Sequence, residues 1–282
     1  MLGSLTLVDL LFLVAPLVVV PLGLRLAPFT GRFAIRVLGV ARIAQPIGAA
    51  GALASFLLPV GWVSGLMAAA WLAACGLAGL AGLAELVEAR SIRPIHLLPA
   101  AAVGFLTFGA GWLVVYRAGI DLGFTPTVAE LTAVHFHYAG FSATLMSALA
   151  LSFLQSRTPR AAPVTEVAGL LVVLGTPITA AGFATGFLIL TVIGPVLLAS
   201  GVLVTAALTA FVVAPRMQSG LARWLLRISA AGVVVPMLLG VDYAAARVLP
   251  IPALDLQGMA LIHGDLNALV FVLIGLVGWT LA

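Results

Sequence analysis

The sequence predicts an all-α fold: a polytopic transmembrane helix bundle of about nine spans, forming a single integral membrane domain over residues 1–282. Of its residues, 63% are hydrophobic and only 8% are charged, whereas soluble domains carry about 25% charged residues. Apolar runs of about 20 residues, the length that crosses the hydrocarbon core as a helix, recur along the whole chain. The lipid bilayer is therefore the expected partner of most of the surface.

Pro, Gly and Arg punctuate the apolar runs, and each interval between them is taken as one span. In chain order the predicted spans are 5–24, 43–60, 63–85, 96–116, 127–154, 164–182, 186–212, 221–242 and 257–280. Pro16, Pro46, Pro177, Pro195 and Pro236 lie inside the first, second, sixth, seventh and eighth spans, and at these positions we expect kinks or local unwinding satisfied by neighbouring helices.

Arginine falls in alternate connections, and this bias predicts the orientation. Eleven of the 13 basic residues lie after the first, third and fifth spans or around the start of the eighth: Arg25, Arg32, Arg36, Arg42, Arg90, Arg93, Arg157, Arg160, Arg216, Arg223 and Arg227. The opposite connections hold only Arg117 and Arg247. The positive-inside rule then predicts a multi-pass inner-membrane protein with the N-terminus outside and the C-terminus in the cytoplasm.

Composition also excludes some functions. The net charge of +4 has this topological explanation, and no arginine cluster interleaves with aromatic residues, so nucleic acid is not an expected partner. Cys75 is the single cysteine, which excludes an intrachain disulfide and a CxxC site. Protein partners are left open.

The fifth span carries two histidines in the segment Ala133-Val134-His135-Phe136-His137-Tyr138. An ionisable side chain at membrane depth is costly and usually marks a functional interior. Because successive helical residues are rotated by 100°, His135 and His137 point about 200° apart. One metal ion cannot be held by both on a regular helix, but two sites on opposite flanks can.

The ninth span carries a second polar segment in its outer half. Met259, His263 and Asn267 form a stripe at i, i+4 and i+8, and Asp265 points to the other flank. His and Met ligands suit haem iron or copper, and His with Asp suits zinc or iron. We therefore predict that His135, His137 and His263 bind a haem or transition metal, with Asp265 as a further metal ligand. The residues expected to support these ligands are Asn267, Tyr138, Met259 and Asp9.

The alternative is that these histidines only bridge helices, contributing about 0.6 kcal/mol each. For His96, which lies at the interface beside Arg93, snorkelling or capping is a sufficient explanation. Asp9 can simply cap the first helix. Asp265 is harder to explain by packing, because a carboxylate inside a span needs a partner or a proton.

The segments Ala133–Phe141 and Met259–Ala268, with the overall layout, resemble the YndJ-like family of bacterial integral membrane proteins. This resemblance covers most of the chain. It implies a polytopic membrane fold and no established activity.

The same segments are distantly similar to haem-copper oxidase subunit I. That family has an A-H-F-H-Y stretch whose two histidines bind two different haems on opposite flanks of one helix, and His135 and His137 match them. Its H-[GA]-x-x-M segment is similar to His263-Gly264. The family also needs three copper-binding histidines and a cross-linked tyrosine, whereas this chain has four histidines in all. An oxygen-reducing dinuclear centre is therefore excluded, and a simpler haem or metal site is the expectation.

Three functional classes follow. The leading hypothesis is metal or haem binding for redox chemistry, sensing or cofactor handling. The second is a proton- or ion-coupled transporter that uses the same residues as a relay. The third is a metal-dependent membrane hydrolase. The chain contains no GxSxG, HExxH or Walker A motif, so whether it is an enzyme stays open.

Overall fold

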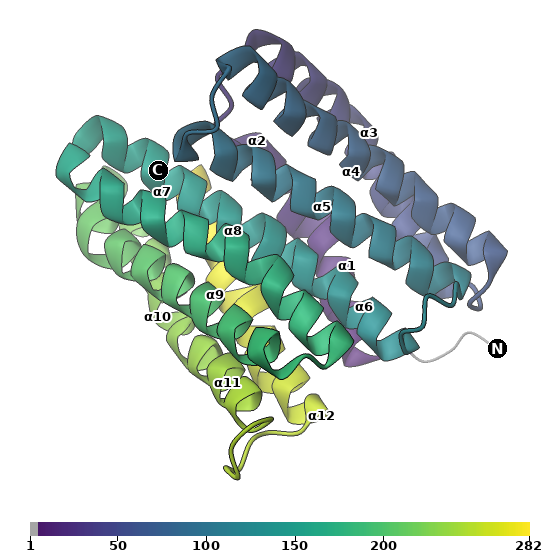
Figure 1. Cartoon of the computed structure of the whole chain (residues 1–282). Coiled ribbons are helices and arrows are strands. Elements are labelled where there is room, and N and C mark those ends of the chain that lie inside the picture. The colour runs from purple at the N-terminus through teal and green to yellow at the C-terminus, as the bar shows by residue number, and fades with distance from the viewer. Residues whose placement is uncertain (1–4) are drawn as a thin grey trace. The chain divides into compact units, whose positions relative to one another are not determined.

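The computed structural model describes residues 5–282, which are helical and contain no strand (Figure 1). Nine helices in these residues are long and apolar enough to cross a membrane, which confirms the predicted multi-pass bundle. They are Leu7–Leu26, Arg32–Leu57, Trp62–Ala89, Pro94–Ala118, Pro126–Arg157, Pro159–Thr185, Leu188–Arg216, Gly220–Ala245 and Leu256–Thr280.

The second span begins earlier than predicted. Its helix, α3, runs from Arg32 to Leu57, whereas the sequence pattern placed the start at residue 43. Arginine is a good helix former, so a change from apolar to basic residues marks the membrane edge and not the helix end. Arg42, on this helix, donates from Nε and a terminal nitrogen to the Leu24 carbonyl at 2.9 and 2.6 Å.

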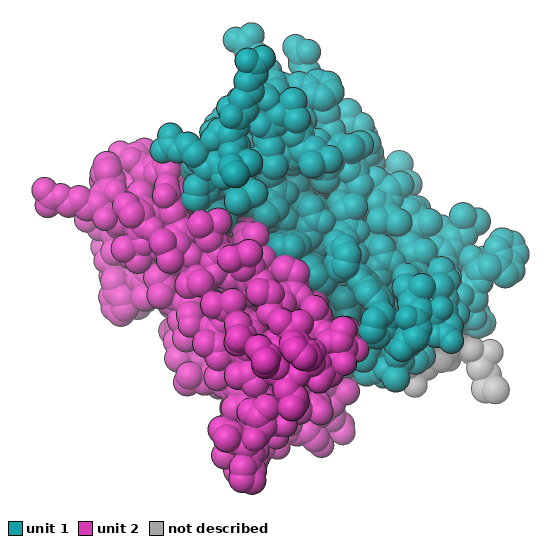
Figure 2. Space-filling view, viewed as in Figure 1, with its two compact units in different colours: residues 1–25, 29–141 teal, residues 26–28, 142–282 magenta. Residues whose placement is uncertain are grey.

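The described chain divides into two compact units, coloured separately in Figure 2. Unit 1 covers residues 1–25 and 29–141, and unit 2 covers residues 26–28 and 142–282. The fifth span contributes to both, because the division falls after Phe141. The prediction of one membrane domain over residues 1–282 stays a prediction.

Unit 1 is built around three long antiparallel helices, in which α4 packs against both α3 and α5 (Figure 1). Its elements are α1 (Leu7–Val14), η1 (Ala15–Val19), α2 (Val20–Leu26) up to Arg25, α3, α4 (Trp62–Ala89), α5 (Pro94–Ala118), α6 (Pro126–His135) and the first part of η2 (Phe136–Ala143). Gly51 lies against the Met67 backbone and Gly65 against Ala118, so small residues let the helices approach closely. Phe12 and Trp71 are among its fully buried side chains.

Unit 2 is organised around the tightly packed α8–α9 hairpin, the neighbouring α10, and the last span. Its elements are α7 (Thr144–Arg157), η3 (Pro159–Ala161), α8 (Ala162–Thr185), α9 (Leu188–Leu208), η4 (Thr209–Val213), η5 (Ala214–Arg216), α10 (Gly220–Gly232), α11 (Val234–Ala245), α12 (Leu256–Gly258), η6 (Met259–Gly264), η7 (Leu266–Leu273) and α13 (Ile274–Thr280). Gly182 faces the backbone at Thr191, and Gly194 faces the backbone at Thr179, so no side chain separates the two helices there.

Several spans contain π-helical stretches, which are rare and frequently mark functional sites. In the described residues these are η1, η2, η4, η6 and η7. Pro16 lies in η1 and removes a regular backbone hydrogen bond, which accounts for that one. Both polar motifs of the sequence fall on the others: η2 begins between His135 and His137, and η6 contains His263.

Candidate functional site

His137 is fully enclosed within unit 1, and both of its ring nitrogens are hydrogen-bonded. Trp71 on α4 donates its Nε1 hydrogen to His137 Nε2 at 3.0 Å, and His137 Nδ1 donates to the Ala133 carbonyl at 2.7 Å. The Phe12 ring centroid lies 4.9 Å away, with the ring planes at 71°. One acceptor and one donor nitrogen define the neutral tautomer. In this arrangement His137 presents no ring lone pair to a metal.

The local backbone explains why His137 makes these contacts. The chain changes from α- to π-helix at Phe136, which breaks the regular i→i−4 pairing, and His137 Nδ1 bonds the carbonyl four residues earlier. Gly109 on α5 leaves the space for the ring, since a Cβ there would lie 2.8 Å from Nδ1. The ring is thus held by three helices of unit 1.

The two neighbours of this histidine have different surroundings. His135 is partly exposed, and its ring stands at 90° to the Phe136 ring with centroids 5.5 Å apart. Tyr138 is 7% exposed and donates its hydroxyl hydrogen to the Leu11 carbonyl at 2.7 Å. Tyr138 therefore ties the fifth span to the first.

Two carboxyl side chains meet where α1 packs against α6 in unit 1. Asp9 is 6% exposed, and its Oδ2 accepts from the backbone nitrogen and hydroxyl of Thr6, both at 2.8 Å. Glu130 lies on α6 close enough to Asp9 for the two carboxyl groups to act on each other electrostatically. Each carboxyl also has one buried oxygen, Asp9 Oδ1 and Glu130 Oε1, for which residues 5–282 supply no donor. The expected capping role of Asp9 is present, but it uses only one of the two oxygens.

A buried arginine lies at the same end of unit 1. Arg117 is 6% exposed, and its guanidinium donates to the Ser55 carbonyl at 3.1 and 2.8 Å and to the Leu58 carbonyl at 2.6 Å. These carbonyls belong to the C-terminal end of α3, where a positive charge is favourable. Within the described part of the chain Arg117 forms no ion pair, although its charge acts on Glu130.

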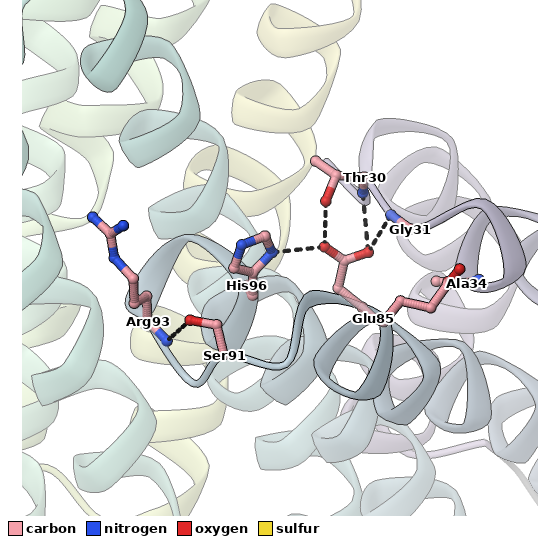
Figure 3. A network of polar contacts seen from close by, with 8 residues as sticks. Thr30, Gly31, Ala34, Glu85, Ser91, Arg93 and His96 are labelled. Atoms are coloured by element: carbon pink, nitrogen blue, oxygen red, sulfur yellow. Dashed lines mark hydrogen bonds and ion pairs between the residues drawn. The ribbon is translucent and has the colours of Figure 1, made fainter.

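A second polar network lies at the other end of unit 1, around the buried side chain of Glu85 on α4. Figure 3 shows its carboxylate between Thr30 and Gly31 on one side and His96 on the other. Oε1 accepts from the Thr30 hydroxyl at 2.7 Å and from His96 Nδ1 at 2.8 Å. Oε2 accepts from the backbone nitrogens of Thr30 and Gly31 at 3.0 and 2.8 Å. Four hydrogen bonds to one 0% exposed carboxyl favour its ionised form.

Glu88, one turn further along α4, completes this arrangement. Its two oxygens accept from the backbone nitrogens of Phe33 and Ala34 at 3.0 and 2.8 Å. The first amides of α3 are thus bonded by two carboxylates of α4, in place of the usual capping side chain at the helix start. Glu88 caps the same helix as Glu85 but forms no hydrogen bond with His96 among the described residues.

In unit 2, His263 is oriented by a single hydrogen bond. Its Nδ1 donates to the Pro236 carbonyl on α11 at 2.7 Å, and Gly240 provides room beside the ring. For Nε2, the described residues provide no hydrogen-bond partner. A histidine that donates one ring nitrogen to a carbonyl and keeps the other open has the geometry that metal-ligating histidines show.

The predicted site residues are thus distributed over both units. His135, His137, Tyr138 and Asp9 belong to unit 1, whereas Met259, His263, Asp265 and Asn267 belong to unit 2. The described residues contain no group of three or more His, Cys, Asp or Glu side chains that could hold a metal ion. The cofactor site of His135, His137 and His263, with Asp265, stays a prediction.

Sequence reasoning missed Glu85 and Trp71 and did not give Arg117 a role. Arg117 had a usable signal, because it stands on the side of the membrane from which arginine is otherwise nearly absent. Trp71 had none, since a tryptophan in an apolar span is ordinary. His96 was interpreted as a capping or snorkelling residue, and the sequence gave no indication of its contact with Glu85.

Comparison with known proteins identifies the family. A family model described as YndJ-like protein matches residues 10–271. Comparison with curated proteins and with solved structures gave no significant match. Because the family match covers nearly the whole chain, this protein belongs to the YndJ-like protein family.

Proposed function

We propose that this protein is a proton- or cation-coupled membrane transporter in which Asp9 and Glu130 bind the coupling ion. The bias of the arginines supports a location of this pair toward the outer face of the inner membrane, in the orientation expected from the positive-inside rule, with the N-terminus outside and the C-terminus in the cytoplasm. The proposal concerns the ion and its site, and the transported substrate is left open.

The supporting observation is a pair of neighbouring carboxyl groups, on the packed helices α1 and α6, that each keep a buried oxygen without a donor among the described residues. A carboxyl group hydrogen-bonds another only when one of them carries a proton. A proton held between Asp9 and Glu130, or a small cation bound by both, supplies the missing partner. Carboxyl pairs within membrane spans are typical of proton and ion pathways.

The local charge balance favours a single monovalent positive charge. Arg117 contributes one positive charge, and ionised Asp9 and Glu130 contribute two negative charges. Binding one proton or one ion such as Na⁺ brings the sum to zero, which the membrane interior favours over a net charge. A divalent cation would leave an excess positive charge.

Carbodiimide labelling tests the site without a substrate. Dicyclohexylcarbodiimide reacts with protonated carboxyl groups in apolar surroundings, so it should modify Asp9 or Glu130 in the purified protein. Asp9→Asn and Glu130→Gln should each change the labelling, and Asp121→Asn, which removes an exposed loop carboxylate, should not. Protection by Na⁺ at constant pH identifies a cation site, and protection by alkaline pH alone identifies a proton site. Absence of label from both residues at acidic pH contradicts the shared proton.

Charge displacement tests the function. The protein reconstituted in liposomes on a solid-supported membrane should give a transient current after a pH jump or a Na⁺ jump. Asp9→Asn and Glu130→Gln should reduce that current by about tenfold or more, equivalent to about 1.4 kcal/mol. Asp121→Asn should retain it. Wild-type currents no larger than those of protein-free liposomes in both jumps would exclude coupled transport.

A second candidate function is binding of a metal or haem through His263, favoured by its fixed Nδ1 and open Nε2. Visible absorbance and metal analysis of the purified protein test it, because haem absorbs strongly in the visible range. His263→Ala should remove a stoichiometric cofactor, and His137→Ala should spare it if the protein still folds. A wild type with neither metal nor haem after expression with iron, copper and zinc supplied would argue against this function.

A further inference from the structure

We propose that His96 and Glu85 form a proton-exchanging dyad at the end of unit 1 opposite to Asp9 and Glu130. His96 is the residue that takes up and releases the proton, at Nε2, and Glu85 is the positioning residue that holds Nδ1. The dyad rests on the contacts of Figure 3. Its part in transport rests on the proposed function.

The first step of the argument is geometric. His96 Nδ1 bonds Glu85 Oε1 at 2.8 Å, and Figure 3 shows the other ring nitrogen pointing away from that carboxylate. The His96 side chain is 22% exposed, whereas that of Glu85 is 1% exposed. The described residues offer Nε2 no hydrogen-bond partner. One ring nitrogen is therefore fixed by a buried anion, and the other is open to exchange.

The second step concerns the rigidity of the anion. Glu85 is held by the Thr30 hydroxyl and by the backbone amides of Thr30 and Gly31, so it cannot turn away from His96 without leaving these donors unpaired. A Cβ on Gly31 would collide with Glu88 and crowd Glu85. A buried carboxylate that orients an imidazole fixes its tautomer and stabilises the imidazolium when it forms.

The third step concerns position. His96 and Arg117 lie near the two ends of α5, about 32 Å apart along a helix that rises 1.5 Å per residue. The hydrocarbon core of a bilayer is about 30 Å thick. The two polar clusters of unit 1 therefore lie near opposite membrane surfaces, as the two exchange points of a proton-coupled protein require.

The proton balance of the step is simple. Neutral His96, with its proton on Nδ1, accepts one proton from water or hydronium at Nε2 and becomes an imidazolium paired with Glu85. Release of that proton from Nε2 restores the starting state. The other charged groups on the elements around His96 in unit 1 are Glu88 of α4, Arg90 and Arg93 of the following turn, Arg32, Arg36 and Arg42 of α3, and Arg117 at the far end of α5.

Histidine acylation tests the dyad directly. Diethyl pyrocarbonate acylates unprotonated ring nitrogens and can be mapped by mass spectrometry of the intact chain's peptides. His96 should react in the folded protein, and His137, with both nitrogens bonded and 0% exposure, should not. Glu85→Gln should change the reaction profile of His96, measured as its acylation rate, by at least about threefold, because a carboxylate no longer holds Nδ1.

Glu88→Gln is the matched control, because it weakens the cap of α3 without touching His96. It should leave the His96 profile unchanged, and Glu85→Asp should restore it in part. Equal profiles for wild type and Glu85→Gln, or equal shifts for Glu85→Gln and Glu88→Gln, would reduce Glu85 to a helix cap and overturn the dyad. Unreactive His96 in the wild type would overturn it as well.

Charge displacement separates this proposal from the proposed function. His96→Gln should reduce the wild-type current after a pH jump on its own side of the membrane by at least about threefold. A wild type without current but with Glu85-dependent acylation refutes coupled transport and leaves the dyad standing. A wild-type current that His96→Gln does not change removes His96 from the transport path.

Discussion

The hydrogen bond between Trp71 and His137 should appear as a coupling free energy of about 1.5 kcal/mol between the substitutions Trp71→Phe and His137→Leu. Each substitution removes one partner of the same bond, and the double variant removes both. The single variants should therefore destabilise the protein by more, in sum, than the double variant does.

The magnitude follows from burial. Both side chains are 0% exposed, and His137 Nδ1 is already engaged by the Ala133 carbonyl. Leaving a buried donor or acceptor unpaired costs about 1–3 kcal/mol. Hydrogen bonds between membrane helices average about 0.6 kcal/mol and reach about 1.7, because the unfolded state in the membrane also finds partners. Both side chains are closed to water, which therefore cannot replace a lost partner, so a value near the upper limit is expected.

Reversible unfolding in mixed micelles, titrated with a denaturing detergent and followed by far-ultraviolet circular dichroism, gives the four free energies of the cycle. Trp71→Phe combined with Gly104→Ala is the control cycle, because Gly104 has no heavy atom within 4 Å of its added Cβ. The control should be additive within about 0.5 kcal/mol. A Trp71–His137 coupling no larger than that of the control would refute the argument from burial.

Three further predictions concern packing, charge and orientation. Gly109→Ala should lower the free energy of unfolding by about 1–3 kcal/mol, because its Cβ would crowd His137. Gly104→Ala on the same helix is the control and should be neutral or slightly stabilising. Thermal unfolding in detergent compares the two variants, and equal midpoints would contradict the packing of Gly109 against His137. Arg117→Met should cost about 2–3 kcal/mol in the same assay, because it leaves the carbonyls at the end of α3 without their donors; an unchanged stability would show that they need none. A reporter that works only in the cytoplasm should be active when fused after Ala282, and activity of a periplasmic reporter there instead would reverse the orientation.

Most of the fold could be predicted from the sequence because crossing a membrane imposes a length and a composition on each helix. The first span was predicted at 5–24 and is found at Leu7–Leu26, and the last was predicted at 257–280 and is found at Leu256–Thr280. The start of α3 was misplaced because hydropathy detects the edge of the bilayer. The helix instead begins where its first backbone amides find hydrogen-bond acceptors. Those partners, Glu85 and Glu88, come from another helix.

Less of the candidate site could be predicted. The cost of polar groups in lipid drew attention to His137 and to Asp9, which was explained as a helix cap, whereas Glu130 was given no role. Their actual partners could not be derived, because the choice between Trp71 and a metal for His137 depends on how helices rotate against each other. The π-helical stretches change the rotation of one helix against another, and apart from Pro16 no sequence feature predicted them.

The capping of α3 by α4 has a consequence for biogenesis. When the second span leaves the ribosome, the amides at its start, from Thr30 to Ala34, lack the carboxylates that later bond them, since Glu85 and Glu88 are synthesised more than fifty residues afterwards. The start of this helix must stay hydrated, or held by the insertion machinery, until the third span has entered the bilayer and delivered both side chains. The second and third spans are therefore completed as a pair, and a nascent chain arrested between them has an unfinished end at its second helix.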